Sequence, residues 1–318
     1  MVLGIIGMPG SGRRTLFGAM CGAVAATAKG GGAAVGNVKV PDSRLDWLAE
    51  LYSPLKFTPA TVEFALPLGS DRTALRQADA LVHVVNCFDG GEPESYWRSL
   101  NDDLLLADME SLEKRVERAR KSAKGDKKYA QEAETLERML AHLADGNPAR
   151  TFDSDVAELL TAKPTICVAN VAESSLGESP RSFGGESAIT VCAKLESDLQ
   201  ELEPEERRTF LDDLGIAETG LDALIRRSYE MLGLISFLTA GHDEVRAWTI
   251  TAGTKAPKAA GKIHSDLERG FIRAEVVAFD DLQSCGNLKA AKDKGLLRVE
   301  GKDYIVRDGD VVNILFNV

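Results

Sequence analysis

The stretch that decides the fold opens the chain: Val2-Leu3-Gly4-Ile5-Ile6, then Gly7-Met8-Pro9-Gly10-Ser11-Gly12-Arg13-Arg14-Thr15, then a helical segment from Leu16. The first five residues are short and apolar, as in a buried strand. A glycine-rich turn between a strand and a helix is typical of a phosphate-binding loop, because its backbone N–H groups and the helix N-terminus can face an anion. The alternative is a plain tight turn.

This turn departs from the P-loop pattern G-x-x-x-x-G-K-[ST] at the two positions that carry chemistry. Arg13 stands at the lysine position and brings a broad planar cation, while Arg14 replaces the hydroxyl that normally holds Mg²⁺. The turn therefore predicts an anion site without a protein ligand for Mg²⁺, and impaired phosphoryl transfer; two solvated arginines are the alternative. The candidate phosphate-binding residues are Gly7, Gly10, Ser11, Gly12, Arg13, Arg14 and Thr15.

Further apolar runs repeat the strand pattern and alternate with amphipathic segments, which indicates a parallel α/β sheet covered on both faces. One stretch breaks the alternation: residues 18–36 are nearly all Ala and Gly, which predicts a mobile loop. The expected strands after the first are Thr61–Leu66, Ala80–Asn86, Pro164–Asn170 and Ala188–Val191.

A helical insertion is predicted over residues 105–146, where apolar residues recur at alternating steps of four and three on both sides of a short turn. This spacing is typical of an antiparallel hairpin that packs mainly on itself. Its tip, residues 114–128, carries eight Lys and Arg against two acidic residues. A solvated charged face is one interpretation, and a contact with RNA or another partner is the other. The candidate contact residues are Lys121, Lys124, Lys127 and Lys128.

The last part of the chain predicts a small α+β module of the β-grasp type. It contains a strand at Val245–Ile250, a helix at Ala259–Leu267, a strand at Phe271–Ala278 and a closing hairpin of Tyr304–Val306 with Val311–Phe316. The predicted domains are therefore an α/β domain of residues 1–104 and 147–233, the helical insertion of residues 105–146, and a β-grasp domain of residues 234–318.

Composition narrows the function classes. The 318 residues include 38 Lys+Arg and 49 Asp+Glu, a formal net charge of −11. This balance excludes a uniformly basic nucleic-acid binder but leaves room for one basic patch. The five cysteines lie far apart, which excludes a disulfide scaffold and a thiolate zinc site and predicts a cytoplasmic protein. We expect no membrane-spanning segment and a monomer.

Several blocks together resemble the YchF subfamily of Obg-like P-loop nucleotide hydrolases. The resemblance runs over the whole chain and is carried by residues 41–46 (PDSRLD), 59–64 (PATVEF), 105–115 (LLADMESLEKR), 160–164 (LTAKP), 245–250 (VRAWTI), 253–257 (GTKAP) and 270–275 (GFIRAE). It implies a P-loop G domain with a coiled-coil insertion and a C-terminal TGS domain. It also implies binding of ATP, often in preference to GTP, and association with ribosomes.

The resemblance further implies a base-binding segment N-x-x-E, which here is Asn170-Val171-Ala172-Glu173, and a second base-proximal loop at Cys192-Ala193-Lys194. A glutamate in place of the aspartate of N-K-x-D weakens guanine selection. The implied base-binding residues are Asn170, Val171, Glu173, Cys192 and Ala193. Read without the family, Asn170 and Glu173 could simply cap a strand end and the turn after it.

The elements that would sense the γ-phosphate or the metal differ from the family pattern. The motif D-x-x-G reads Leu66-Pro67-Leu68-Gly69, and the first switch segment is replaced by the Ala/Gly run of residues 27–36. We therefore expect a degenerate paralogue: a ribosome- or translation-associated protein that binds ATP or GTP weakly, without the usual Mg²⁺ ligands and with impaired hydrolysis. The alternative is a nucleotide-free pseudo-GTPase that acts as a scaffold for RNA, the ribosome or a protein.

Overall fold

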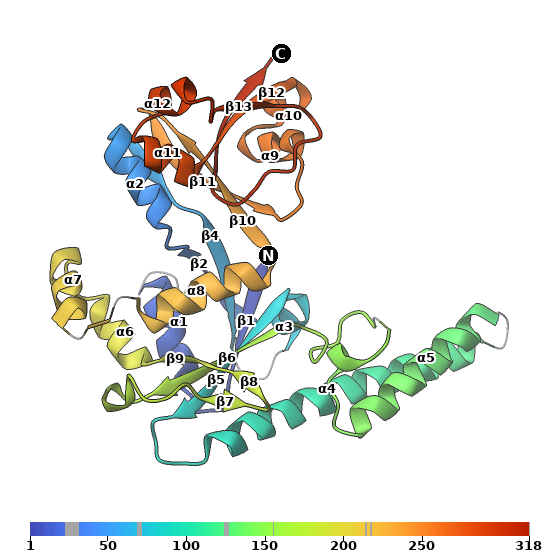
Figure 1. Ribbon diagram of the computed structural model, residues 1–318. Coiled ribbons are helices and arrows are strands. Elements are labelled where there is room, and N and C mark those ends of the chain that lie inside the picture. The colour runs from blue at the N-terminus through green and yellow to red at the C-terminus, as the bar shows by residue number, and fades with distance from the viewer. Residues whose placement is uncertain are drawn as a thin grey trace. The chain divides into compact units, whose positions relative to one another are not determined.

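The computed structural model describes residues 1–22, 32–68, 72–123, 127–154, 156–213, 215–216 and 218–317. The chain divides into two compact units, which we describe separately (Figure 1). Unit 1 comprises Met1–Asn37 and Glu63–Leu224, and unit 2 comprises Val38–Val62 and Ile225–Val318.

Unit 1 is built on a six-stranded sheet with the order β2-β4-β1-β5-β6-β9. The pairs that join β4, β1, β5, β6 and β9 are all parallel, and the mixed α/β fold class predicted from the sequence is confirmed. The strands are β1 (Val2–Ile6), β2 (Ala33–Lys39), β4 (Thr61–Pro67), β5 (Ala80–Cys87), β6 (Thr165–Val171) and β9 (Ile189–Val191).

The helices of this unit connect the strands and flank the sheet. They are α1 (Arg13–Cys21), α3 (Thr73–Gln77), α4 (Pro93–Ser122), α5 (Lys127–Ala144), α6 (Ala193–Leu199), α7 (Pro204–Asp213) and the first turn of α8 (Gly220–Met231), which continues into unit 2 from Ile225, with short 3₁₀ turns η1 (Ala149–Thr151) and η2 (Glu173–Ser175). A small hairpin of β7 (Ser182–Phe183) and β8 (Glu186–Ser187) precedes β9. No described helix is long and apolar enough to cross a bilayer.

The predicted mobile loop at residues 18–36 is wrong at both ends. Helix α1 continues to Cys21, and β2 begins at Ala33, where Ala33 and Ala34 are buried. The small side chains here allow close packing: a Cβ on Gly36 would collide with Cys21 Sγ. Composition alone misses this, because backbone pairing in a sheet needs no large side chain. Residues 23–31 lie outside the described residues.

The helical hairpin forms with the predicted seam, and Figure 1 shows α4 and α5 side by side. Met139 is also buried in the seam although it does not fit the four-and-three spacing, whereas Tyr129, which does fit it, is 41% exposed. Helix α4 begins at Pro93 rather than at Leu105, because its first turns pack on the sheet through Leu104. The other seam residues that are buried are Leu105, Leu112, Val116, Ala119, Ala133, Leu136 and Leu143.

A buried carboxylate holds the base of this hairpin. Asp108 on α4 is 0% exposed and accepts hydrogen bonds from the Leu160 and Thr161 backbone N–H groups, at 2.9 and 2.8 Å. The Thr161 hydroxyl donates a third, at 2.8 Å. These bonds attach residues 160–161, which follow the hairpin and precede β6, to helix α4.

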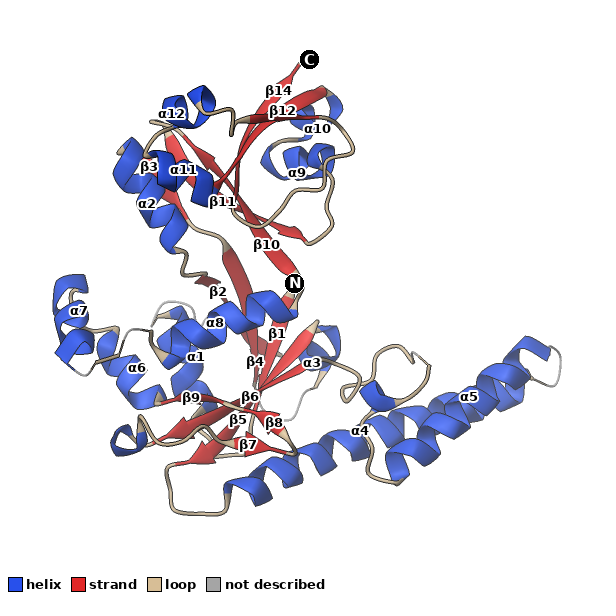
Figure 2. Cartoon of the chain, viewed as in Figure 1, coloured by secondary structure: helices blue, strands red, loops and turns tan. Residues whose placement is uncertain are grey.

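Unit 2 contains a mixed six-stranded sheet with the order β13-β12-β14-β10-β11-β3 (Figure 2). Strand β14 is antiparallel to β12 and parallel to β10, as in a β-grasp module. The strands are β3 (Lys56–Thr58), β10 (Leu234–Ala240), β11 (Glu244–Thr251), β12 (Phe271–Ala278), β13 (Arg298–Glu300) and β14 (Asp310–Phe316), with helices α2 (Ser43–Tyr52), α9 (Ala256–Ile263), α10 (Ser265–Arg269), α11 (Phe279–Cys285) and α12 (Leu288–Asp293).

Two predicted details of this unit are wrong. The closing hairpin does not form: β14 pairs with β12 and β10, while Ile305 makes only an isolated bridge with Lys255. The predicted helix over residues 259–267 is two helices, because His264 between them is extended and its Nδ1 accepts the Asp266 N–H at 3.2 Å. The first outcome depends on strands that are distant from β14 in the sequence. The second depends on one capping residue, His264.

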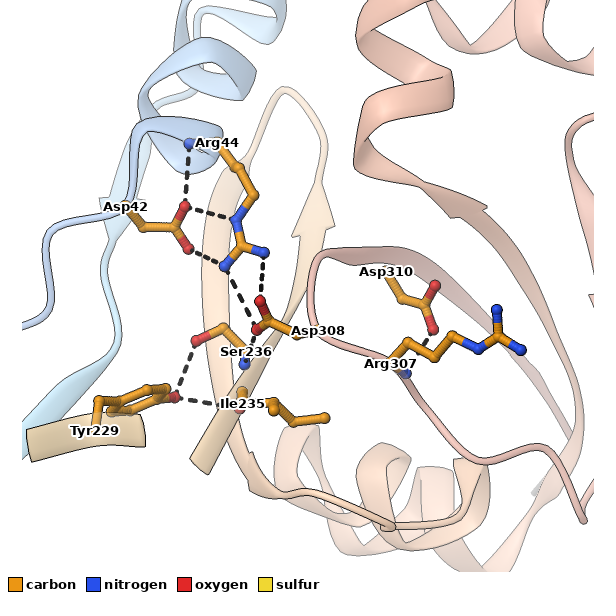
Figure 3. A network of polar contacts seen from close by, with 8 residues as sticks. All are labelled: Asp42, Arg44, Tyr229, Ile235, Ser236, Arg307, Asp308 and Asp310. Carbon is orange, nitrogen blue, oxygen red and sulfur yellow. Dashed lines mark hydrogen bonds and ion pairs between the residues drawn. The ribbon is translucent and has the colours of Figure 1, made fainter. Parts of the chain in front are cut away.

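Residues 38–62 group with unit 2, although the predicted boundaries place them in the α/β domain. Strand β3 pairs in parallel with β11, and α2 packs on this sheet. At the start of α2 the Arg44 guanidinium donates to Asp42 and to Asp308, and Asp308 in turn accepts the Ser236 N–H at 2.8 Å (Figure 3). The boundary near the C-terminal module likewise falls after Leu224 rather than after residue 233.

Candidate functional site

The predicted phosphate loop joins β1 to α1. Gly12 is the N-cap of α1 and has a φ of 82°, a left-handed conformation that favours glycine. A Cβ at this position would also collide with Asn170 Nδ2, so only glycine fits here. Gly12 has no side chain that could cap α1, and no side chain of the described residues accepts a hydrogen bond from the first N–H groups of the helix.

Asn170 joins the loop to the two segments implied to hold a base. It lies at the end of β6 and is buried, with 4% of its surface exposed. Its Nδ2 donates to the Ser11 carbonyl at 2.9 Å, and its Oδ1 accepts the Ala193 N–H at 3.0 Å. One side chain thus brings together the glycine-rich loop, the segment after β6 and the start of α6.

The two arginines of the loop behave differently. Arg13 is half-buried, and its Nη1 donates to the Gly7 carbonyl at 2.5 Å, which folds the side chain back over the loop. Burial lowers the pKa of Arg13, and the positive charge of the neighbouring Arg14 lowers it further. Arg14 and Thr15 are exposed. Ser11 is 1% exposed, and among the described residues its Oγ has no hydrogen-bond partner.

A cavity of about 980 Å³ lies against these segments. Of the predicted site residues, the structure brings to it Gly12 and Thr15 from the loop, and Asn170, Val171, Glu173, Cys192 and Ala193 from the segments after β6 and β9. The predicted residues Gly7, Gly10, Ser11, Arg13 and Arg14 do not line it. Ala172 and Lys194, which belong to the two predicted base-proximal segments, also line it, and the lining residues that sequence reasoning missed are Phe88, Ser174, Leu176, Gly177, Gly215 and Ile216.

Phe88 is the missed residue that the sequence could have indicated. It follows β5 directly, at the carboxyl end of a strand adjacent to β1 and β6, where ligands of parallel sheets bind. Its N–H donates to Asn86 Oδ1 at 3.1 Å, and Asn86 Nδ2 donates to Asp89 Oδ2 at 2.7 Å. This local network holds the aromatic ring, which is 44% exposed, at the cavity wall.

The described residues fit a nucleotide better than they fit a metal ion. The uncapped start of α1 offers backbone N–H groups to an anion. At the aspartate position of D-x-x-G, Leu66 is 4% exposed within β4 and carries no oxygen ligand. Arg14 has only donors. Gly69 of that motif and the two residues after it, 70 and 71, lie outside the described residues.

The predicted contact residues at the hairpin tip are described only in part. Lys121 Nζ pairs with Glu117 Oε1 at 2.6 Å, which lowers the pKa of Glu117. Lys128 lies in the first turn of α5. Lys124 and the side chain of Lys127 lie outside what the structure describes.

Comparison with known proteins now identifies the family. Over 364 aligned residues the chain is 42% identical to the ribosome-binding ATPase YchF of Bacillus subtilis, with 100% of both chains covered. It is 36% identical over 362 residues to the protein of the same name from Mycoplasma genitalium, with 99% of both covered. The chain belongs to the YchF family.

Two further comparisons agree with this assignment. The YchF-GTPase C-terminal family model (YchF-GTPase_C), described as "Protein of unknown function (DUF933)", matches residues 234–317. The structure of the Schizosaccharomyces pombe YchF GTPase superposes with a TM-score of 0.83 at 28% identity, covering 99% of this chain and 97% of that one. The resemblance to YchF inferred from the sequence blocks is confirmed over the full length. The alignments are longer than the 318 residues here, so this YchF chain is shorter than its relatives at some positions.

Proposed function

We propose that this YchF chain binds a purine nucleoside phosphate in the cavity beside Gly12 and associates with ribosomes, while nucleotide hydrolysis is impaired. The observation that carries the proposal is the composition of one cavity wall. Gly12 and Thr15, at the start of α1, line the same 980 Å³ space as Asn170–Ser174 and Cys192–Lys194. A phosphate group suits the start of α1, and a base suits the two segments Asn170–Ser174 and Cys192–Lys194.

The base would lie among the segments that follow β6 and β9. Glu173 is exposed at this wall. Its carboxylate can therefore accept hydrogen bonds from the exocyclic amine of a base without first breaking a hydrogen bond to another described residue. Phe88 offers an aromatic face to a planar ring. Because the longer carboxylate suits guanine poorly, and because several relatives are named ATPases, we propose ATP or ADP ahead of GTP.

The phosphates would lie at the N-terminus of α1. Arg13 must release the Gly7 carbonyl to reach them, which makes binding weaker than in a loop whose cation is free. Leu66 and Arg14 provide no oxygen ligand, so we propose that binding does not require Mg²⁺. The same two residues account for the proposed loss of hydrolysis.

We propose ribosome association from the names of the relatives and from the charge of the hairpin tip. The B. subtilis and M. genitalium proteins are named ribosome-binding ATPases. Residues 114–128 carry eight basic and two acidic residues on a chain of net charge −11. A local basic surface of this kind suits a phosphate backbone, and we propose Lys121, Lys124, Lys127 and Lys128 as contacts.

A nucleotide-free scaffold is the second candidate, and one observation favours it. The Arg13 guanidinium closes on the Gly7 carbonyl at 2.5 Å, so the loop satisfies its own cation without a phosphate. In that case the α/β body would serve only to hold the hairpin and the β-grasp module.

Isothermal titration with ATP, ADP and GTP, each with and without Mg²⁺, separates the two candidates. We expect ATP and ADP to bind with little dependence on Mg²⁺. Gly12→Ala should weaken binding by about tenfold or more, because its Cβ would displace Asn170, whereas Gly18→Ala on the exposed side of α1 should leave binding unchanged. No heat and no thermal stabilisation with any of the three nucleotides would favour the scaffold.

A further inference from the structure

A second cavity, of about 330 Å³, adjoins the proposed nucleotide cavity within unit 1. Residues of β9, α6, α7 and the start of α8 line most of it. The two cavities meet at a common wall, because four residues line both of them: Leu176, Gly177, Cys192 and Ile216. The second cavity therefore continues from one side of the first.

The wall of the second cavity is mainly aliphatic. Its carboxylate Glu196 is already used inside the protein: Oε1 accepts the Leu221 N–H at 3.0 Å, and the Thr219 side chain also hydrogen-bonds with this carboxylate. Glu218, which lines the cavity too, has an interaction of its own. What remains for a ligand to contact is an apolar surface, formed by Ile189, Leu195, Leu199 and Leu211.

The common wall lies beside the segments proposed to hold the base. Leu176 follows the turn η2, and its N–H donates to the Glu173 carbonyl at 3.1 Å, which keeps these two residues in one turn. Cys192 belongs to the second base-proximal loop and is the N-cap of α6. A purine whose exocyclic amine donates to the Glu173 carboxylate would therefore place that amine beside the common wall.

We propose that the second cavity receives an apolar substituent on the exocyclic amine of a bound purine nucleotide, so that the chain accepts N⁶-alkylated or N⁶-benzylated adenine nucleotides. This inference rests on the nucleotide binding proposed above and specifies the ligand class of that site. It requires no charged contact in the second cavity, in agreement with the aliphatic wall.

The chemistry of a substituted amine suits both cavities. The exocyclic amine of adenine has two N–H groups, and a substituent replaces only one of them. The remaining N–H can still donate to Glu173, while the substituent is transferred from water to the aliphatic wall. An apolar cavity of about 150 Å³ is enough for benzene, so the second cavity, at about 330 Å³, has room for a benzyl or a five-carbon group.

Isothermal titration of the full chain with ADP, N⁶-benzyl-ADP and 8-benzylamino-ADP tests the proposal. N⁶-benzyl-ADP should bind about fivefold or more tightly than ADP, because burial removes the apolar surface of the benzyl group from water. The 8-benzylamino isomer carries the same group at another position of the purine, away from the exocyclic amine. It should bind no more tightly than ADP.

Ala223→Phe fills the second cavity from α8, and Ala223 does not line the first cavity. This variant should remove the advantage of N⁶-benzyl-ADP and leave the affinity for ADP unchanged within about twofold. Ala141→Phe is the matched control, because it adds the same ring at an exposed position of α5 that lines neither cavity. It should behave as the natural chain does. Circular dichroism melts establish that each variant is folded, and Ala223→Leu, a smaller filling, replaces Ala223→Phe if the latter does not fold.

Two results would overturn this inference and leave nucleotide binding intact. In the first, ADP binds but N⁶-benzyl-ADP binds no more tightly than ADP or than the 8-benzylamino isomer. In the second, a folded variant with a filled second cavity keeps the full advantage of N⁶-benzyl-ADP. If neither ADP nor N⁶-benzyl-ADP binds, the proposed nucleotide site is itself wrong and this inference fails with it.

Discussion

Arg44 and Asp308 form an ion pair of 2.7 Å although 264 positions separate them in the sequence. The same guanidinium donates through Nε to Asp42 Oδ1 at 2.8 Å, and Asp308 also accepts the Ser236 N–H. The hydrogen bonds to Asp42 and Asp308 raise the pKa of Arg44. This arrangement attaches the segment that contains α2 to the strand β10 and to the turn before β14, all within unit 2 (Figure 3).

Removing this guanidinium should destabilise the protein measurably. Because Arg44 is only 26% exposed and contacts two carboxylates, we expect Arg44→Ala to lower the free energy of unfolding by about 1–2 kcal/mol, after allowance for the half-exposed Asp308. Urea unfolding followed by circular dichroism measures this. Lys255→Ala is the control: its pair with Asp303 is exposed, and the loss should stay below about 0.5 kcal/mol. Equal losses in the two variants would contradict the structural role of Arg44.

Asp108 should contribute more to stability than any exposed acidic residue of α4. Asp108→Ala removes the acceptor of three buried hydrogen bonds and leaves two backbone N–H groups without a partner. We expect a loss of about 3–5 kcal/mol in the free energy of unfolding. Asp102→Ala, on the exposed side of the same helix, should change it by less than about 0.5 kcal/mol. A loss below 1 kcal/mol for Asp108→Ala would show that the hairpin base is held by other contacts.

His83 should make stability depend on pH in the acid range. It is 1% exposed in β5, and burial lowers its pKa from 6.5 to about 4. The unfolded chain therefore binds more protons than the folded one between these values, and stability falls as pH falls from about 6.5 to about 4, by about 3 kcal/mol in total.

The measurement is the free energy of unfolding of the natural chain and of His83→Met at pH 7 and pH 4.5. Other groups titrate equally in both proteins, so the difference isolates His83. The natural chain should lose about 2–3 kcal/mol more than the variant on acidification. Identical losses would mean that the imidazole takes up a proton in the folded state without cost.

The hairpin tip should matter for ribosome binding through its local charge. Changing Lys121, Lys124, Lys127 and Lys128 together to Glu should weaken co-sedimentation with ribosomes by about tenfold or more and reduce its salt dependence. The control carries the same change in net charge on unit 2: Lys289, Lys292, Lys294 and Lys302 to Glu. If both variants pellet equally, net charge rather than the tip decides the association.

Much of unit 1 could be predicted from local sequence. Local hydrophobic patterns indicate which residues of an element are buried, and a few residues of a strand or a few turns of a helix are enough to show them. Such patterns predicted β1, β5 and β6 from their apolar runs, and α4 and α5 from their four-and-three spacing. The strand–turn–helix order around Gly12 likewise located one end of the cavity. Strand β2 escaped because Ala33 and Ala34 are small, and small residues carry no clear periodic signal.

The tertiary structure alone decided which distant segments meet. By itself the sequence determined the α/β pattern, the glycine-rich turn and the helical hairpin, because these depend on neighbours in the chain. Pairing partners depend on contacts between residues that lie outside each other's local sequence, so the placement of β3 beside β11, the pairing of β14 with β12 and the ion pair of Arg44 with Asp308 had no local signature. Gly12 and the segments after β6 and β9 come to one cavity for the same reason.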